Sequence, residues 1–300
     1  MNLLSVTLAT LMTSVGLAGG EISHGQGRIS IISVGALTRE LSRWSIIDAR
    51  ETGEFEKGHI PGSRPMKWRD WTLQSPGLVG YLFGNPAKWG KVPAPTEGLQ
   101  ERLREAGLSN TRAIVIAGKP GAWGEEGRIA WNLLYWGANE VALLDGGYPA
   151  WRASGRPIET GEAKAISKGD FLLAIRSKRR AEKEEVLHAL QNKNRTILDA
   201  RNLVEFNGKQ VTAQKRGGHL PGAVLIPVTS LYQEDGSYIS NTALRDLVPR
   251  AAKHPIAYCV GGVRSALLAL LIEARLGMSV ANYEGSLWEW ASDPVLPLEK

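Results

Sequence analysis

The sequence predicts an α/β protein of two similar units, each a parallel sheet flanked by helices on both faces. Short apolar segments alternate with amphipathic ones along the chain, as expected for parallel strands joined by helices. One series of motifs occurs twice in the same order. The length of 300 residues suits two domains of ordinary size, and a hydrophobic content of 43% can supply a core for each.

The repeated series starts with a strand ending in Asp-Ala-Arg and continues into a Gly-His-x-Pro-Gly loop. These motifs occupy residues 48–50 and 58–62 in the first unit, and 199–201 and 218–222 in the second. Each unit closes on a glycine turn followed by a tryptophan, Trp151 or Trp290. We expect the aspartates to bond the local backbone, the histidines to make structural hydrogen bonds, and both tryptophans to lie in the core.

The repeat places a first domain at residues 30–155, a linker at 156–180 and a second domain at 181–298. Residues 1–20 contain no charged side chain and combine an apolar centre with small residues, which is typical of a signal peptide. We therefore expect a periplasmic or exported protein. Without that signal the protein would be cytoplasmic, and only an uncleaved segment 1–20 would anchor it to a membrane.

The chemistry is expected at Cys259, the single cysteine of the sequence. Residues 256–258 are predicted to end a strand, and residues 265–276 to form a helix capped by Gly277. The tight turn between them offers inward-facing amides and the positive end of a helix dipole, which would stabilise a thiolate or a bound anion. A buried, inert thiol is the alternative. The glycine pair 261–262 and Arg264 favour a nucleophilic Cys259. The turn expected to bind the substrate consists of Val260, Gly261, Gly262, Val263, Arg264 and Ser265.

The corresponding stretch of the first unit, residues 117–123, contains no thiol. Lys119 could act there only as an amine, and nothing nearby marks it as reactive. We therefore expect the first domain to be catalytically silent and to form a wall of the cleft.

Together with Tyr-Glu-Gly-Ser-x-x-Glu-Trp at residues 283–290, these motifs resemble the rhodanese family in its tandem form, over roughly residues 34–298. The resemblance implies two rhodanese-like domains, with the active site in the second, and sulfur transfer through a Cys259 persulfide without a cofactor. It also implies that Arg201 binds an oxyanion of the donor. An arginine paired with Glu205 is the alternative. Arg264 is expected either to raise the positive potential at the pocket rim or to bind nearby carbonyl groups.

Two details bear on the substrate. The spacing C-x4-R is one residue shorter than in related tyrosine phosphatases, which favours a terminal sulfur over a phosphoryl group. In the 3-mercaptopyruvate enzymes of the family a second arginine stands where this chain has Glu205, so thiosulfate, a persulfide or a polysulfide is the expected donor. A 3-mercaptopyruvate sulfurtransferase, a sulfane-sulfur carrier without efficient turnover and a non-catalytic binding module are the alternatives.

The net charge of +6 should attract small anions. Because the basic residues are scattered, we expect no nucleic-acid partner. The lone cysteine and the spacing of the five histidines indicate no metal site. The expected partners are therefore a small anionic sulfur donor and a thiol or cyanide acceptor, bound by a monomer.

Overall fold

The computed structural model describes residues 25, 27–73, 86–121 and 123–300. The predicted signal peptide at residues 1–20 lies outside this described part. Among the described residues, no helix is both long and apolar enough to cross a bilayer.

The first half contains a parallel sheet with the strand order β1-β5-β4-β2-β3 among the described residues. Its strands are β1 (Arg28–Ile32), β2 (Trp44–Asp48), β3 (Arg64–Pro65), β4 (Ala113–Ala117) and β5 (Glu140–Leu144). Its helices are α1 (Val34–Arg39), α2 (Thr52–Lys57), α4 (Glu97–Glu105), α5 (Glu125–Trp136) and α6 (Gly147–Ala153).

The second half contains a parallel sheet in the order β7-β6-β8-β9, again counted over the described residues. Its strands are β6 (Ile197–Asp199), β7 (Val224–Leu225), β8 (Ile256–Tyr258) and β9 (Ala281–Asn282). Its helices are α7 (Lys183–Asn192), α8 (Leu203–Phe206), α9 (Asn241–Leu247), α10 (Val263–Leu276) and α11 (Ser286–Trp290). This order repeats β3-β2-β4-β5 of the first half, so the structure confirms both the duplication and the predicted fold class.

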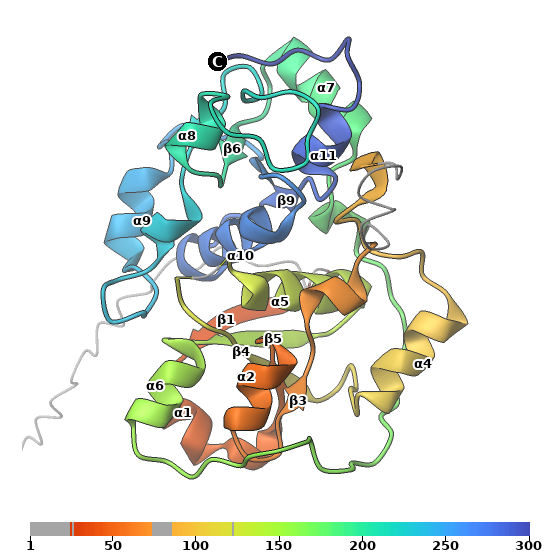
Figure 1. Cartoon of the computed structure of the whole chain (residues 1–300), viewed down its shortest axis with the longest axis vertical. Coiled ribbons are helices and arrows are strands. Elements are labelled where there is room, and N and C mark those ends of the chain that lie inside the picture. The colour runs from red at the N-terminus through yellow and green to blue at the C-terminus, as the bar shows by residue number, and fades with distance from the viewer. Residues whose placement is uncertain (1–24, 26, 74–85, 122) are drawn as a thin grey trace, which may run out of the picture.

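Helices cover both faces of each sheet (Figure 1). In the first half, α1 and α6 pack on one face through Leu37 and Trp151. In the second half, α7 and α11 pack on the outer face through Val186 and Trp290. Between the two sheets lies a shared core that contains residues of α4, α5, α9 and α10. Helices α5 and α10 pack directly against each other, so the halves are joined by continuous apolar packing.

The repeated motifs hold the chain in the same way in both halves. Asp48 accepts the amide of Arg50 at 3.0 Å, and Asp199 accepts that of Arg201 at 2.9 Å. Nδ1 of His59 lies 3.0 Å from the carbonyl oxygen of Phe55, and the ring of His219 makes the matching contact. Trp151 and Trp290 are buried. These structural roles are confirmed.

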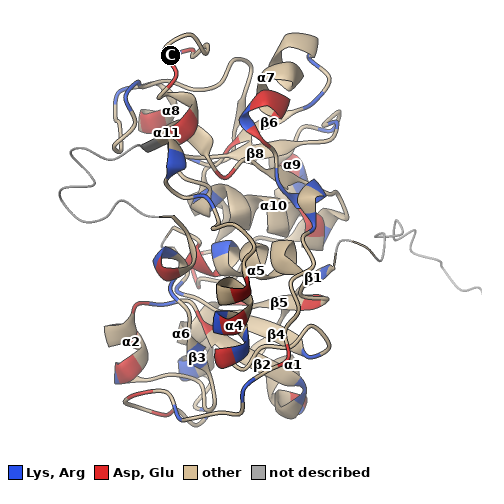
Figure 2. Ribbon diagram, turned by 90° about the vertical axis from the view of Figure 1, so that its right-hand side faces the viewer, with Lys and Arg blue, Asp and Glu red and all other residues tan. Residues whose placement is uncertain are grey.

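Charged residues of both signs are interspersed along the ribbon in Figure 2, without a single basic face in that view. The densest basic run of the sequence, residues 178–180, is partly neutralised. Arg179 forms a buried ion pair with Glu273, with Nη1 2.9 Å from Oε2, and Arg180 pairs with Glu182.

Candidate active site

Cys259 follows β8 directly and begins the turn that leads into α10. The helix starts at Val263, two residues before the predicted start at residue 265, because Gly262 adopts a left-handed conformation (φ +78°) and serves as its N-cap. Gly277 ends the helix as predicted. The earlier start shortens the turn and brings the first amides of the helix close to the cysteine.

The sulfur of Cys259 lies among hydrogen-bond donors of this turn. The amides of Gly261 and Ser265 donate to it, and the hydroxyl of Ser265 lies 3.6 Å from Sγ. The amide of Cys259 itself donates to the hydroxyl of Ser286 at 3.0 Å. The turn therefore curls around the sulfur as the sequence predicted.

The pKa of Cys259 is lower than that of an ordinary cysteine. Burial by itself would raise this pKa, because it disfavours the thiolate. The positive charge of Arg264 and the hydrogen bonds from Ser265 and from the amide of Gly261 outweigh that effect. The site thus stabilises a thiolate, or an anionic sulfur attached to it.

Arg264 lines the site but does not stand there as an isolated charge. Its guanidinium forms a bidentate ion pair with Glu205, with contacts of 2.6 and 2.8 Å. The carboxylate of Glu205 is itself buried, at the start of α8. A buried bidentate pair fixes both side chains. Arg264 therefore contributes positive potential near the sulfur, while two of its five N–H groups are already bound by Glu205.

The first half supports the turn from behind. Arg128 of α5 is fully buried and donates from Nη1 to the carbonyl oxygen of Gly262 at 3.1 Å. Gly90 packs on the same turn so closely that a Cβ atom there would lie 2.4 Å from the carbonyl oxygen of Gly261. The Nδ2 atom of Asn282 also donates to the Gly262 carbonyl, at 3.1 Å. Both halves therefore position the turn.

Cys259 opens into a cavity of about 390 Å³ between the two halves. Of the predicted turn residues, Val260, Gly261, Val263 and Arg264 line it together with Cys259. Gly262 and Ser265 do not line it. The carbonyl oxygen of Gly262 accepts a hydrogen bond from Arg128, and the hydroxyl of Ser265 donates one to Asn282. The wall from the first half consists of Trp68, Arg69, Trp89 and Trp123, and the second half adds Trp288 and residues of α8 and of the insert at 207–217.

The predicted contact between Arg201 and the donor has to be corrected. The guanidinium of Arg201 is fully buried, lies 2.6 Å from Asp199 and donates to the carbonyl oxygen of Gly218 at 2.9 Å. Its contact with Glu205 is to the backbone carbonyl at 3.3 Å, so the alternative carboxylate pair is not formed either. Arg50 is bound in the same way by Asp48 in the first half. The Asp-Ala-Arg triplet is therefore a structural element of both halves.

The corresponding place in the first half is occupied by a glycine. Asp48 pairs with Ala117 as Asp199 pairs with Tyr258, so Gly118 corresponds to Cys259. A Cβ atom at Gly118 would lie 2.5 Å from the carboxylate of Glu126, which fills that space. Lys119 is exposed and forms an ion pair with Glu54 at 2.5 Å. This geometry is consistent with a silent first half.

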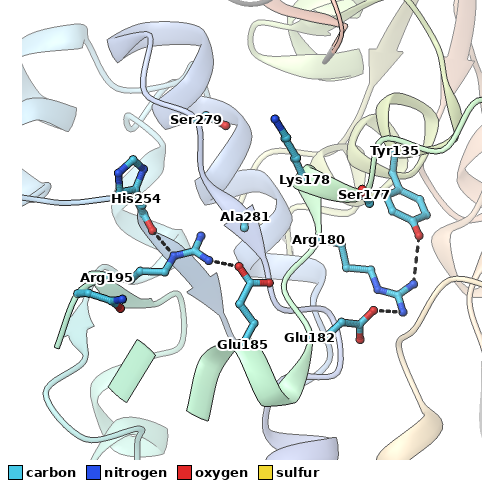
Figure 3. Close-up of a pocket in the computed structure, with 11 residues that line it drawn as sticks. Tyr135, Ser177, Lys178, Arg180, Glu182, Glu185, Arg195, His254, Ser279 and Ala281 are labelled. Atoms are coloured by element: carbon cyan, nitrogen blue, oxygen red, sulfur yellow. Dashed lines mark hydrogen bonds and ion pairs between the residues drawn. The ribbon is translucent and has the colours of Figure 1, made fainter. Parts of the chain in front are cut away.

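A larger cavity of about 780 Å³ lies away from the cysteine, around the start of β9 and the linker (Figure 3). Most of its charged side chains form ion pairs or hydrogen bonds with neighbouring groups. Arg195 pairs with Glu185 and donates to the carbonyl oxygen of His254 at 2.7 Å, and Arg180 contacts the hydroxyl of Tyr135 at 3.2 Å. Cys259 does not line this cavity, so we place the chemistry in the smaller one.

Several site residues were not predicted from the sequence: Trp68, Arg69, Trp89, Trp123, Arg128 and Trp288. All but the last come from the first half and reach the site only through the packing of α5 on α10 and the long connection after β3. The tryptophan content of residues 68–95 was the available signal, although it indicated no contact with Cys259.

Comparison with known proteins shows which family the chain resembles. The rhodanese-like domain family matches residues 33–154 and again residues 182–293. A protein of Saccharopolyspora erythraea, provisionally named thiosulfate sulfurtransferase, is 30% identical over 83% of this chain and 87% of its own. SseB of Mycobacterium tuberculosis, named in the same provisional way, is 29% identical over 96% of each chain.

Two solved structures share the fold. SseA from Escherichia coli, described as a 3-mercaptopyruvate sulfotransferase, has a TM-score of 0.73 at 24% identity and covers 86% of this chain and 99% of its own. EanB in complex with ergothioneine has a TM-score of 0.75 at 21% identity, with coverages of 90% and 70%. With two matched domains over most of its length and a sulfurtransferase-named relative at 30% identity, the chain belongs to the rhodanese family in its tandem form.

Proposed function

We propose that this protein is a thiosulfate sulfurtransferase that works through a persulfide on Cys259. The thiolate attacks the outer sulfur of thiosulfate, a new S–S bond forms, and sulfite leaves with the electron pair of the broken S–S bond. Cyanide or a thiolate then attacks the outer sulfur of the persulfide. The products are thiocyanate or a new persulfide, and the Cys259 thiolate is regenerated.

The observation that carries this proposal is the set of donors around Sγ of Cys259. The amides of Gly261 and Ser265 and the charge of Arg264 lower the pKa of the thiol. The same groups are placed to stabilise a negative charge on an attached sulfur, because they are fixed before the reaction begins. Family membership and the names of the relatives point to the same chemistry.

The ion pair between Arg264 and Glu205 supports sulfur transfer over phosphate chemistry. A phosphatase of this fold needs the arginine of the turn to bind phosphate oxygens. Here Nη1 and Nη2 of Arg264 both bind the carboxylate of Glu205. The carboxylate of Glu205 would also repel the carboxylate of 3-mercaptopyruvate. Arg69 lines the cavity, and among the described residues its charge acts on the carboxylate of Glu125 without forming a direct ion pair. It is therefore a better candidate than Arg201 for attracting an anionic donor.

Mass spectrometry tests the proposal directly. After incubation with thiosulfate, the intact protein should gain one sulfur atom on Cys259, and cyanide should remove it with formation of thiocyanate. The Cys259→Ser variant should gain none. A protein that loads one sulfur but does not cycle with thiosulfate and cyanide would be a carrier, and one that fails to load from thiosulfate but loads from 3-mercaptopyruvate would belong to the other branch of the family.

We also propose export through residues 1–20 and a monomeric state. The sequence pattern of that segment supports the first point. Comparing the N-terminus of the secreted and the intracellular protein would test it, and sedimentation equilibrium would test the second.

A further inference from the structure

Four tryptophans surround the cavity at Cys259, and we call Trp68, Trp89, Trp123 and Trp288 the tryptophan recess. The sequence contains ten tryptophans in all, so this one cavity takes a large share of them. Three come from the first half and one from the second. The recess therefore exists only where the two halves meet, above the reactive sulfur.

The indole of Trp288 is held rigidly beside the cysteine turn. Its Nε1 atom donates to the carbonyl oxygen of Thr212 at 2.9 Å. Its ring packs on Gly261 so closely that a Cβ atom there would lie 2.1 Å from the ring. Trp89 meets it edge to face, with ring centroids 5.7 Å apart. These contacts give the recess a fixed aromatic wall within reach of any group bound to Cys259.

Trp123 completes the recess from the turn that precedes α5. Its side chain is 50% exposed, although exposure of an indole is unfavourable in water. An exposed aromatic that faces a cavity next to a nucleophile is typical of a ligand contact.

The known small substrates of a thiosulfate sulfurtransferase do not need such a wall. Thiosulfate and cyanide are small hydrated anions, which gain from amides and cations rather than from indole faces. The volume of about 390 Å³ lies in the range for an organic ligand. The cations of the cavity serve the anionic donor: Arg264 is paired with Glu205, and Arg69 lies over the ring of Trp68, 4.7 Å from its centroid. They give the other three indoles no role in binding thiosulfate or cyanide.

We propose that the sulfur acceptor is an organic thiol with a planar aromatic or heteroaromatic body that lies among the indoles of the tryptophan recess. This inference rests on the proposed function. The acceptor thiolate attacks the outer sulfur of the Cys259 persulfide and forms an S–S bond. The S–S bond to Cys259 breaks, its electron pair leaves on the Cys259 thiolate, and the acceptor departs as an aromatic persulfide anion.

The test separates loading from discharge. The protein is first loaded with thiosulfate, checked by intact mass and freed of donor. It is then discharged with phenylmethanethiol, cyclohexylmethanethiol or 2-mercaptoethanol, three alkyl thiols that differ in the body attached to the same kind of sulfur. Aromatic pairs gain about 0.5–1.5 kcal/mol beyond burial, so we expect phenylmethanethiol to discharge about two- to tenfold more efficiently than its saturated analogue.

Two substitutions of Trp123 sharpen the result. Trp123→Leu should lower the ratio of aromatic to saturated discharge towards one, and Trp123→Phe should restore it. Leu172→Ala, which removes an exposed apolar side chain that does not line the cavity, should leave the ratio unchanged.

The outcomes are distinct. If loading fails, the proposed function fails. If loading succeeds but the aromatic and saturated thiols discharge equally well, or 2-mercaptoethanol matches both, the recess does not select an aromatic acceptor and this inference is overturned. A ratio that persists in Trp123→Leu would also overturn it.

Discussion

The Nη1 atom of Arg128 lies 3.1 Å from the carbonyl oxygen of Gly262, so a side chain of the first half holds the turn that carries Cys259 in the second. The same guanidinium donates to the carbonyl oxygen of Gly90 at 2.5 Å and contacts the carboxylate of Glu284 at 3.1 Å. Burial lowers the pKa of Arg128, and the negative charges of Glu284 and Cys259 act against that effect. The first half thus contributes directly to the geometry of the site.

Replacing Arg128 by Met should both destabilise the protein and slow persulfide formation. Removing one partner of a buried ion pair typically costs about 3–5 kcal/mol, because the remaining charge is left unpaired. Arg180 also contacts Glu284, at 3.3 Å, so we expect a loss near the lower end, about 3 kcal/mol. Urea unfolding and the rate of sulfur loading measure the two effects.

The double variant Arg128→Met/Glu284→Gln separates them. Neutralising the buried carboxylate that has lost Arg128 should restore part of the stability. Loading should stay slow, because the carbonyl oxygen of Gly262 keeps only Asn282 of its two side-chain donors and the turn is no longer held from the first half. Recovery of loading in step with stability would show that Arg128 acts only through folding.

Arg264 and Glu205 should shift the pH dependence of loading in opposite directions. Loading requires the Cys259 thiolate, so its rate falls as the pH decreases through the pKa of Cys259. Arg264→Met removes a positive charge and leaves the Glu205 carboxylate uncompensated, which raises that pKa and moves the acid limb to higher pH. Glu205→Gln leaves Arg264 unpaired, which lowers the pKa and moves the limb to lower pH.

The measurement is the rate of loading with thiosulfate over about pH 5 to 9. On the acid limb of this pH profile, a change of one unit in the pKa of Cys259 changes the thiolate fraction tenfold. We expect Arg264→Met to load about tenfold more slowly than the natural protein on that limb. If both variants moved the limb in the same direction, the electrostatic account of the thiolate would be wrong.

The duplication could be predicted from the sequence because each repeated motif makes local contacts that its own residues determine. Asp48 binds Arg50 as Asp199 binds Arg201, within three residues of chain. The repetition also bears on the role of Arg201. A triplet present in the half without Cys259 as well as in the half with it points to a structural role, and for this reason the predicted donor contact of Arg201 was wrong.

The other side of the cavity could not be predicted in this way. Arg128 and Gly262 are 134 positions apart, and they meet because α5 packs on α10. No local pattern encodes that contact. Trp68 and Trp89 likewise reach the cavity at Cys259 only through the arrangement of the two halves. The sequence therefore suggested a wall without identifying the side chains that form it.

Gly262 and Gly277 provide a matched pair at the two ends of α10. Both have left-handed backbone, with φ of +78° and +66°, so an alanine at either position should cost about 1 kcal/mol in backbone strain. At Gly277 nothing lies within 4 Å of the new Cβ atom, whereas at Gly262 it would lie 2.6 Å from the Cα atom of Glu284. We expect Gly277→Ala to load sulfur normally. Gly262→Ala should be clearly less stable and should load sulfur about tenfold more slowly or worse. A tenfold slower rate needs a rise of only about 1.4 kcal/mol in the activation free energy. Equal losses of stability would show that the backbone close to Glu284 can relax.

Glu126 should make the stability of the protein depend on pH. Its carboxylate is buried between the halves, 2.7 Å from the hydroxyl of Tyr232 and 3.1 Å from that of Tyr238. Burial raises the pKa of Glu126 from 4.5 to about 7, although both tyrosine hydroxyls oppose the shift. Because the folded protein holds this proton more tightly than the unfolded chain, the free energy of unfolding should fall as the pH rises from about 4.5 to 7 and stay lower above that.

A pKa raised from 4.5 to about 7 corresponds to a loss of about 3 kcal/mol. Glu126→Gln keeps an acceptor for the tyrosines but has no proton to lose, so it should unfold at higher urea than the natural protein near pH 8 and show little difference near pH 4.5. Glu234→Gln, which neutralises an exposed carboxylate of the second half, should change neither value. If the natural protein and Glu126→Gln lost stability equally between these two pH values, the carboxyl group of Glu126 would not be the one that titrates. In that case the contact of α5 with the two tyrosines would be a fixed part of the interface and would not depend on pH.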